Sequence, residues 1–116
     1  MAKGVNRNQA ERAAKLKGIT LGQAYQDYLA NRQLTPNTLR DYSRAMRAGF
    51  DDWADKPITS LNRNMIEQRF NQLSQDHGNA QANQRFRFLR ALLNFSMERY
   101  STQDGEPLIP SNPCNR

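Results

Sequence analysis

The arginines of the stretch TPNTLRDYSRAMRAGF, residues 35–50, have a type and spacing that could bind an anion. Arg40, Arg44 and Arg47 stand four and then three positions apart, so on a helix they share one face. A guanidinium group can bond two oxygens of a phosphate at once, and it can also bond the edge of a guanine. The row therefore fits a nucleic acid, and the alternative interpretation is a solvated basic face.

A second polar group lies in the stretch NQRFRFLR, where three arginines follow an Asn-Gln pair. Asn and Gln side chains can pair with adenine in the major groove, and the arginines can reach phosphate or guanine. The same alternative holds, with acidic neighbours such as Asp41 and Glu98 as partial partners of a solvated face. We expect a DNA-binding surface formed by Arg40, Arg44, Arg47, Asn83, Gln84, Arg87 and Arg90, and Arg85 lies in the same stretch.

The residues that usually perform catalysis or bind metals do not form a convincing set. His77 precedes Gly78 with no nucleophile or base placed beside it. One cysteine and one histidine cannot form a Cys/His metal cluster or an internal disulfide. There is no glycine-rich phosphate loop. We expect no catalytic residue, no metal and no cofactor.

An acidic cluster is the remaining candidate for a metal site. Asp51, Asp52 and Asp55 gather at the expected end of the helix that carries the arginine row. They could bind a cation, but a solvated acidic helix end is the simpler interpretation. Carboxylates are disfavoured at a helix C-terminus, so we expect a nearby arginine or lysine to offset them.

Length and charge restrict the class of protein. A chain of 116 residues has the size of one domain, and its apolar fraction of 37% suits a narrow core with a large wet surface. Residues 1–18 hold five basic residues against the single Glu11, a net +4 of the total +6. This stretch lacks the apolar run of a signal peptide, and no segment approaches the ~18 apolar residues of a membrane span. We expect a cytoplasmic protein with an anionic partner, no membrane and no small-molecule substrate.

Apolar periodicity predicts four helices and no strands. The first starts after a Thr20 cap and ends near Gln33, and the second starts at Pro36 and runs to Trp53 or Ala54. Asn62 caps the third, Gly78 terminates it, and the fourth covers about 80–100. The inward residues that we expect are Leu21, Ala24, Tyr25, Tyr28 and Leu29; Leu39, Tyr42, Met46, Phe50 and Trp53; Met65, Ile66, Phe70 and Leu73; and Phe86, Phe88, Leu89, Leu92, Leu93, Phe95, Met97 and Tyr100.

These elements predict an all-α fold, a compact four-helix bundle whose broadly apolar fourth helix is central. We expect residues 19–102 to form the bundle. Residues 1–18 would be a flexible basic arm or linker, and residues 103–116, with three prolines and a glycine, a flexible tail. The arm and the tail are expected to lie outside the bundle.

An ordered set of short motifs resembles the core-binding domain of phage-type tyrosine recombinases, the integrases. The motifs are Thr20-Leu21, Tyr28-Leu29, PNTLRDY at 36–42, PITSL at 57–61, NQRFRFLRALLNF at 83–95, and Asn112-Pro113. Each motif is weak, but their order is specific, and together they span nearly the whole chain from about residue 19 to 113. Two positions depart from the family pattern, since Gln81 stands where threonine is frequent and Ser96 where alanine is usual.

The resemblance implies a SAM-like helical domain that binds double-stranded DNA at the crossover site during DNA integration and recombination. In that family the second and fourth helices meet the major groove, and the core-binding and catalytic domains clamp the duplex together with other protomers. The basic arm is similar to the linker that follows an arm-binding domain. The catalytic Arg, Lys, His-x-x-Arg motif and nucleophilic Tyr belong to a further domain, so none of the tyrosines here is carried over and we expect no enzymatic activity of this chain.

Two other functions stay open from the sequence. One is an all-α DNA-binding domain of a transcription regulator, which a following segment with His-x-x-Arg and a late Tyr would exclude. The other is a helical protein-interaction bundle, whose binding would survive high salt because it does not depend on phosphate contacts. The sequence names no attachment site, because phosphate contacts position a protein without reading the bases.

Overall fold

The computed structural model describes residues 18–101, 105–106, 108–109 and 111–114, and these form an all-α domain. Among the described residues there is no strand, and a single isolated bridge joins Thr20 to Pro57. The α-helices are α2 (Leu21–Asn31), α3 (Pro36–Gly49), α4 (Arg63–His77) and α5 (Asn79–Arg99), with short 3-10 turns η1 (Asp51–Trp53) and η2 (Ile58–Ser60) between α3 and α4. The predicted all-α, four-helix fold is confirmed.

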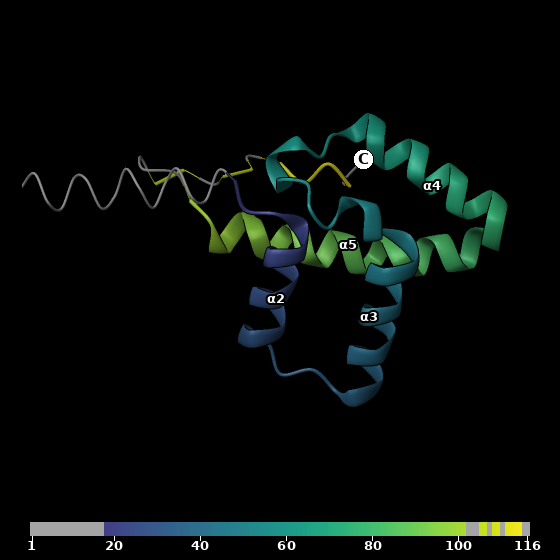
Figure 1. The fold of residues 1–116 in the computed structure, drawn as a ribbon, viewed down its shortest axis with the longest axis horizontal. Helices are drawn as coiled ribbons and strands as arrows, with labels where there is room; N and C mark the ends of the chain where they lie inside the picture. The colour runs from purple at the N-terminus through teal and green to yellow at the C-terminus, as the bar shows by residue number, and fades with distance from the viewer. Residues whose placement is uncertain (1–17, 102–104, 107, 110, 115–116) are drawn as a thin grey trace, which may run out of the picture.

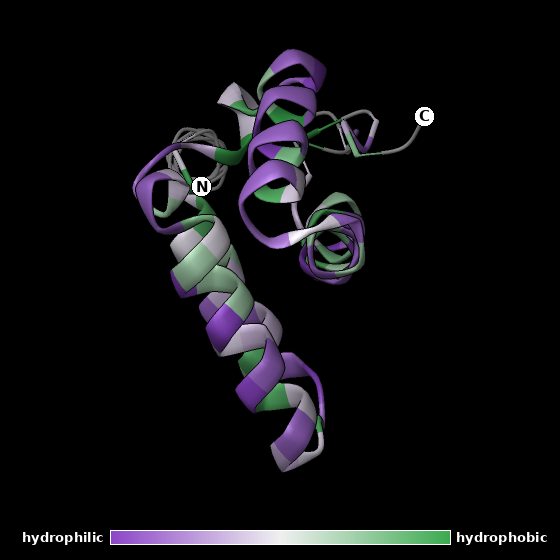
Figure 2. Cartoon of the chain, turned by 90° about the vertical axis from the view of Figure 1, so that its right-hand side faces the viewer, coloured by the Kyte–Doolittle hydropathy of each residue, from purple (hydrophilic) through white to green (hydrophobic). Residues whose placement is uncertain are grey.

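Helix α5 is the central element of the domain. Helices α2 and α3 form a hairpin on one side of it, and α4 folds back along another side (Figure 1). Figure 2, which looks almost along α5, shows the hairpin and α4 leaving α5 in different directions. Because α5 meets all three neighbours, it buries a broad face, and its opposite face is exposed. Its buried residues are Ala82, Arg85, Phe86, Phe88, Leu89, Leu92, Leu93, Phe95 and Ser96.

The helix starts follow from local capping. The Thr20 hydroxyl accepts a hydrogen bond from the Gln23 backbone N–H at 3.1 Å, and the Gln23 side chain accepts one from the Thr20 N–H at 2.9 Å. Pro36 occupies the first turn of α3, where its missing N–H costs nothing. Asn62 caps α4 through the Met65 N–H at 2.9 Å. Gly78 has φ +92° and separates α4 from α5, a backbone conformation that glycine adopts without strain.

Helix α3 ends earlier than its apolar spacing predicts. The chain leaves helical geometry at Phe50, with φ −137° and ψ 19°, so the expectation of a helix to Trp53 or Ala54 is wrong. The turn η1 that follows brings the centre of the Trp53 ring to 5.5 Å from the centre of the Phe50 ring, and both side chains are buried. The two aromatic rings therefore reach the core through a tight turn.

Leu39 was predicted to face the core, but it is exposed. Its exposed fraction is 39%, whereas Ala45 and Met46 further along α3 are buried. In Figure 1, α3 begins at the end of the hairpin that points away from α5 and approaches α5 only towards its own C-terminus. The apolar stripe of α3 is therefore covered over its second half and not at its start.

The described part of the C-terminal tail packs against the bundle. The Asn112 side chain donates hydrogen bonds to the Arg90 carbonyl at 3.1 Å and to Asn94 Oδ1 at 2.8 Å, and the Leu108 N–H donates to the Tyr100 carbonyl at 2.9 Å. Leu108, Ile109, Asn112 and Cys114 are buried. The expectation of a tail outside the bundle is wrong for these residues. Leu108, Ile109 and Cys114 bury their side chains in the core cluster, and Asn112 bonds to α5. The predicted N-terminal arm lies outside the described residues.

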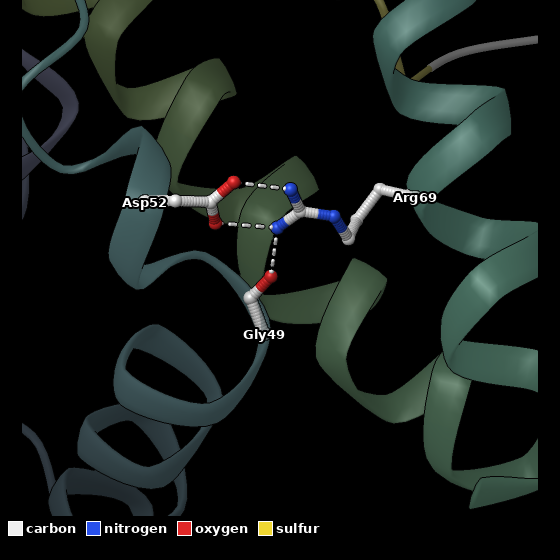
Figure 3. A network of polar contacts seen from close by, with 3 residues as sticks. All are labelled: Gly49, Asp52 and Arg69. Carbon is white, nitrogen blue, oxygen red and sulfur yellow. Dashed lines mark hydrogen bonds and ion pairs between the residues drawn. The ribbon is translucent and has the colours of Figure 1, made fainter. Parts of the chain in front are cut away.

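An arginine offsets the acidic end of α3, as the sequence predicts. Arg69 of α4 binds both carboxylate oxygens of Asp52, at 2.8 and 2.5 Å, and donates to the Gly49 carbonyl at 2.6 Å (Figure 3). Its guanidinium carbon lies 4.4 Å from the centre of the Trp53 ring. One side chain of α4 thus holds the end of α3 and the turn η1 in place.

Replacing Asp52 with Asn is expected to destabilise the domain modestly and in a pH-dependent way. Hydrogen bonds from Arg69 hold the pKa of the Asp52 carboxyl below its usual value of 3.8. Such a group stabilises the fold above pH 3.8, and this stabilisation is lost as the pH falls through the lower folded pKa. Because 63% of the Asp52 side chain is exposed, we expect a loss of at most about 1 kcal/mol at pH 7.

Urea unfolding of Asp52→Asn at pH 7 and at pH 2–3 measures this effect. Asp55→Asn is the matched control, since Asp55 is exposed and forms no ion pair with a described residue. The difference between parent and Asp52→Asn should shrink at the lower pH, and the control should track the parent at both. An equal loss for the two variants would show that the Arg69 pair contributes nothing.

Candidate nucleic-acid interface

The three arginines of α3 form one exposed face. Arg40, Arg44 and Arg47 are exposed, while Ala45 and Met46 on the other side of the helix are buried. None of the three forms an ion pair with a described residue, and Arg47 makes one weak contact, 3.5 Å from Nη2 to the Ser43 hydroxyl. The guanidinium groups are therefore available to an external anion. They also line a shallow depression along α3.

A second exposed row runs along α5. Asn83, Arg87 and Arg90 are exposed and follow one another at helical steps of four and three residues, and Gln84 is exposed beside them. Asn112 of the tail bonds to the Arg90 carbonyl and to the side chain of Asn94, which lies one turn further along α5. The tail thus borders this row at its C-terminal end.

A groove between α3 and α5 brings one arginine of the first set beside two residues of the second. It encloses about 230 Å³, below the ~300–1,000 Å³ of pockets that hold drug-sized ligands, so it suits a small group. Arg44 and Asp41 stand on its α3 wall, and Gln84 and Arg87 on its α5 wall. The full lining is Thr38, Asp41, Tyr42, Arg44, Ala45, Gln81, Gln84, Arg85, Arg87 and Phe88.

The remaining predicted residues of α5 lie on a different surface. Asn83 and Arg90 line a hollow between α5, the start of α4 and the tail residues Pro113 and Cys114. Arg87 borders both this hollow and the groove beside α3. The predicted site residues therefore occupy two neighbouring surfaces that meet at Arg87.

Arg85 differs from the other arginines of α5. Only 7% of it is exposed, and its Nη1 has no hydrogen-bond partner among the described residues. The spacing carries a signal for this burial, since Arg85, Leu89, Leu92 and Ser96 follow at steps of four, three and four residues along the buried face. The sequence interpretation grouped Arg85 with the exposed arginines, although its helical position is that of a core residue.

The described residues contain no group of three or more His, Cys, Asp or Glu that could hold a metal ion. Burial raises the pKa of the Cys114 thiol to about 12, so the thiol stays protonated near neutral pH. Burial, and then a hydrogen bond to Asp27 at 2.6 Å, raise the pKa of Tyr100. Burial also raises the pKa of Tyr25 and of Tyr28.

Comparisons with known proteins add no identification. No family model, no curated protein and no solved structure matches the chain. Separately, no helix within the described ranges is long and apolar enough to cross a membrane.

Proposed function

We propose that this domain binds double-stranded DNA, as the core-binding domain of a tyrosine recombinase. The observation that carries the proposal is the exposed arginine face of α3, which forms no ion pair with a described residue and whose Arg44 shares a narrow groove with Gln84 and Arg87 of α5. The motif order that resembles the integrases supports the same function. The arginine face would contact phosphates, and Gln84 or Arg87 at the groove would approach the base edges.

The proposed role is binding and positioning, not catalysis. The only histidine, His77, is followed by Gly-Asn-Ala and forms no His-x-x-Arg motif. In the assembly that we propose, strand cleavage would be supplied by a catalytic domain, and other protomers would complete the complex around the duplex. A domain that contacts one side of the duplex should bind weakly, in the non-specific range of ~10⁻⁴ to 10⁻⁶ M.

The salt dependence of duplex binding tests this proposal, with Arg44→Ala as the diagnostic variant. Fluorescence anisotropy of a labelled duplex at several salt concentrations between 50 and 200 mM gives the slope of log affinity against log salt. If Arg44 contacts a phosphate, Arg44→Ala should weaken binding to all duplexes alike and make this slope shallower by about one. If Arg44 reads a guanine, the loss should be on the order of 1–3 kcal/mol and confined to one base position.

Two results would count against the proposal. Binding to a partner that is unchanged at high salt would favour a protein-interaction bundle. No amide chemical-shift change in α3 or α5 on adding duplex at 50 mM salt would exclude this surface as the DNA interface. Fold stability of Arg44→Ala should stay within ~0.5 kcal/mol of the parent, since Arg44 is exposed and forms no ion pair with a described residue.

A further inference from the structure

Arg85 is a buried cation without a partner among the described residues. Its exposed fraction is 7%, its Nη1 is buried and unbonded, and it forms no ion pair with a described residue. Buried charges in proteins are normally paired or hydrogen-bonded, because removing an ion from water is costly. A partner for this guanidinium group would have to come from outside the described residues.

The surroundings of Arg85 show where such a partner would enter. Its stem lies under the end of α3, since a Cβ added at Gly49 would be 3.4 Å from Arg85 Cδ and 3.7 Å from Leu73 Cδ1. Arg85 also lines the groove between α3 and α5, and Arg44 and Arg87 line the same groove. Three arginines from two helices therefore line one small hollow.

The groove also contains neutral donors and one acidic group. The Thr38 hydroxyl and the Gln81 and Gln84 amides can donate to an anion. Asp41 is the acidic residue of the lining, and its carboxylate forms no ion pair with Arg85 or with any other described residue. The balance of the lining is three cations to one anion, so the groove as it stands attracts a negative group.

We propose that the groove between α3 and α5 is a binding site for a phosphate group, with Arg85 at its base and Arg44 and Arg87 at its walls. The tetrahedral oxygens of a phosphate accept several charge-assisted hydrogen bonds at once, which suits guanidinium groups that approach from two helices. The source is either free phosphate or the backbone phosphodiester of a duplex. The second source rests on the proposed function, whereas the site itself rests on the burial of Arg85.

Nuclear magnetic resonance of the arginine side chains tests the site directly. The Nε–Hε signals of the ¹⁵N-labelled chain are followed while inorganic phosphate is added, with sodium chloride at equal ionic strength as the reference. The expected result is a saturable shift of the Arg85 signal with phosphate and none with chloride. Equal responses to the two salts, or no response of Arg85 to phosphate, would overturn the proposal.

Variants separate binding from packing. Arg85→Met keeps an unbranched stem but removes the charge and all donors, so phosphate affinity should fall by about tenfold or more. In phosphate-free buffer its Tm should equal or exceed that of the parent, because a buried unpaired charge has been removed. The parent should gain thermal stability from phosphate relative to chloride, and Arg85→Met should not. Asp41→Asn should tighten phosphate binding, because it removes the opposing charge.

The matched control is Arg99→Met, which alters an exposed arginine near the C-terminal end of the same helix. It should keep the phosphate-dependent gain in Tm. If Arg85→Met fails to fold, the shift of the parent's Arg85 signal decides the question. If Arg85→Met folds and keeps the full phosphate-dependent gain, the assignment of Arg85 is wrong.

A duplex titration distinguishes the two sources of phosphate. Displacement of bound phosphate from Arg85 by a short duplex would assign the site to the DNA backbone. Duplex binding that leaves the Arg85 signal unmoved would retain the proposed function and exclude the backbone as the source. Phosphate binding in a chain that binds no duplex would retain the site and refute the proposed function.

Discussion

Replacing Arg40, Arg44 and Arg47 together with Ala is expected to lower the affinity for a DNA duplex on the order of 100-fold at 50 mM salt. All three side chains are exposed on one face of α3, and none is paired with a described carboxylate. Removing three phosphate contacts should also make the slope of log affinity against log salt shallower by about 2.7. Fluorescence anisotropy across a salt series measures both quantities.

Two control variants separate position from charge. A triple Arg→Lys variant keeps the three charges on the same face and should retain most of the non-specific binding. Its affinity should fall only where an arginine makes a bidentate contact, which lysine cannot form. A double variant, Lys56→Ala with Arg99→Ala, removes two exposed charges outside the proposed surface and should bind nearly as well as the parent.

The triple Ala variant should remain folded. Its substitutions lie on the exposed side of α3, and alanine has at least the helix propensity of arginine. Circular dichroism and urea unfolding confirm the fold before binding is measured. A folded triple variant that binds the duplex as tightly as the parent would show that the arginine face is only solvated and that its charge does not serve DNA.

Replacing Phe88 with Ala should have the largest effect on stability, a loss of about 3–5 kcal/mol. Phe88 is 1% exposed, and its ring centre lies 4.8 Å from that of Tyr42, 5.6 Å from that of Tyr25 and 6.4 Å from that of Phe50. The Phe88 ring therefore packs α5 against both helices of the hairpin, α2 and α3. A domain of this size has a free energy of unfolding of about 5–15 kcal/mol, so the variant would approach the limit of folding.

Urea unfolding measures the loss, and two further variants show its origin. Phe88→Leu retains most of the buried volume and should cost less than about 1.5 kcal/mol. Phe70→Ala truncates an aromatic residue of α4 that is only half-buried, so its cost should lie well below that of Phe88→Ala. A loss below about 1 kcal/mol for Phe88→Ala would contradict the central role of this ring.

The same position links stability to the proposed site. Phe88 and Tyr42 both line the groove that holds Arg44 and Arg87. A cavity at residue 88 should loosen α3 against α5 and so widen the groove. At temperatures where Phe88→Ala is still folded, we therefore expect weaker duplex binding than for Phe88→Leu.

The helix starts were predictable because capping is a local interaction. Thr20 and Asn62 bond N–H groups three residues ahead, and Pro36 and Gly78 act through their own backbone geometry. These four residues set helix boundaries whatever the rest of the fold does. The end of α3 was predicted wrongly because no local residue enforces it, and the turn at Phe50 follows from packing against α5 and α4.

The packing of the C-terminal tail was not predictable for a related reason. Its prolines and glycine disfavour a helix, and the described tail residues form none. Composition does not show whether such a segment is free or packed. Leu108 and Ile109 cover part of the bundle, and the Asn112 side chain meets the Arg90 carbonyl and Asn94. The partners of Asn112 are about twenty residues distant in the chain, so the local sequence pattern does not predict these contacts.

The sequence by itself determined that four helices form, where three of them begin, and that Arg40, Arg44 and Arg47 share one face. These properties depend on contacts within one or two helical turns. The tertiary structure alone decided which faces are covered: Leu39 is exposed, Arg85 is buried, and Arg87 stands where two surfaces meet. The helical period fixes the angle between side chains around a helix. Which of these side chains are exposed to water depends on how α3 and α4 pack around α5.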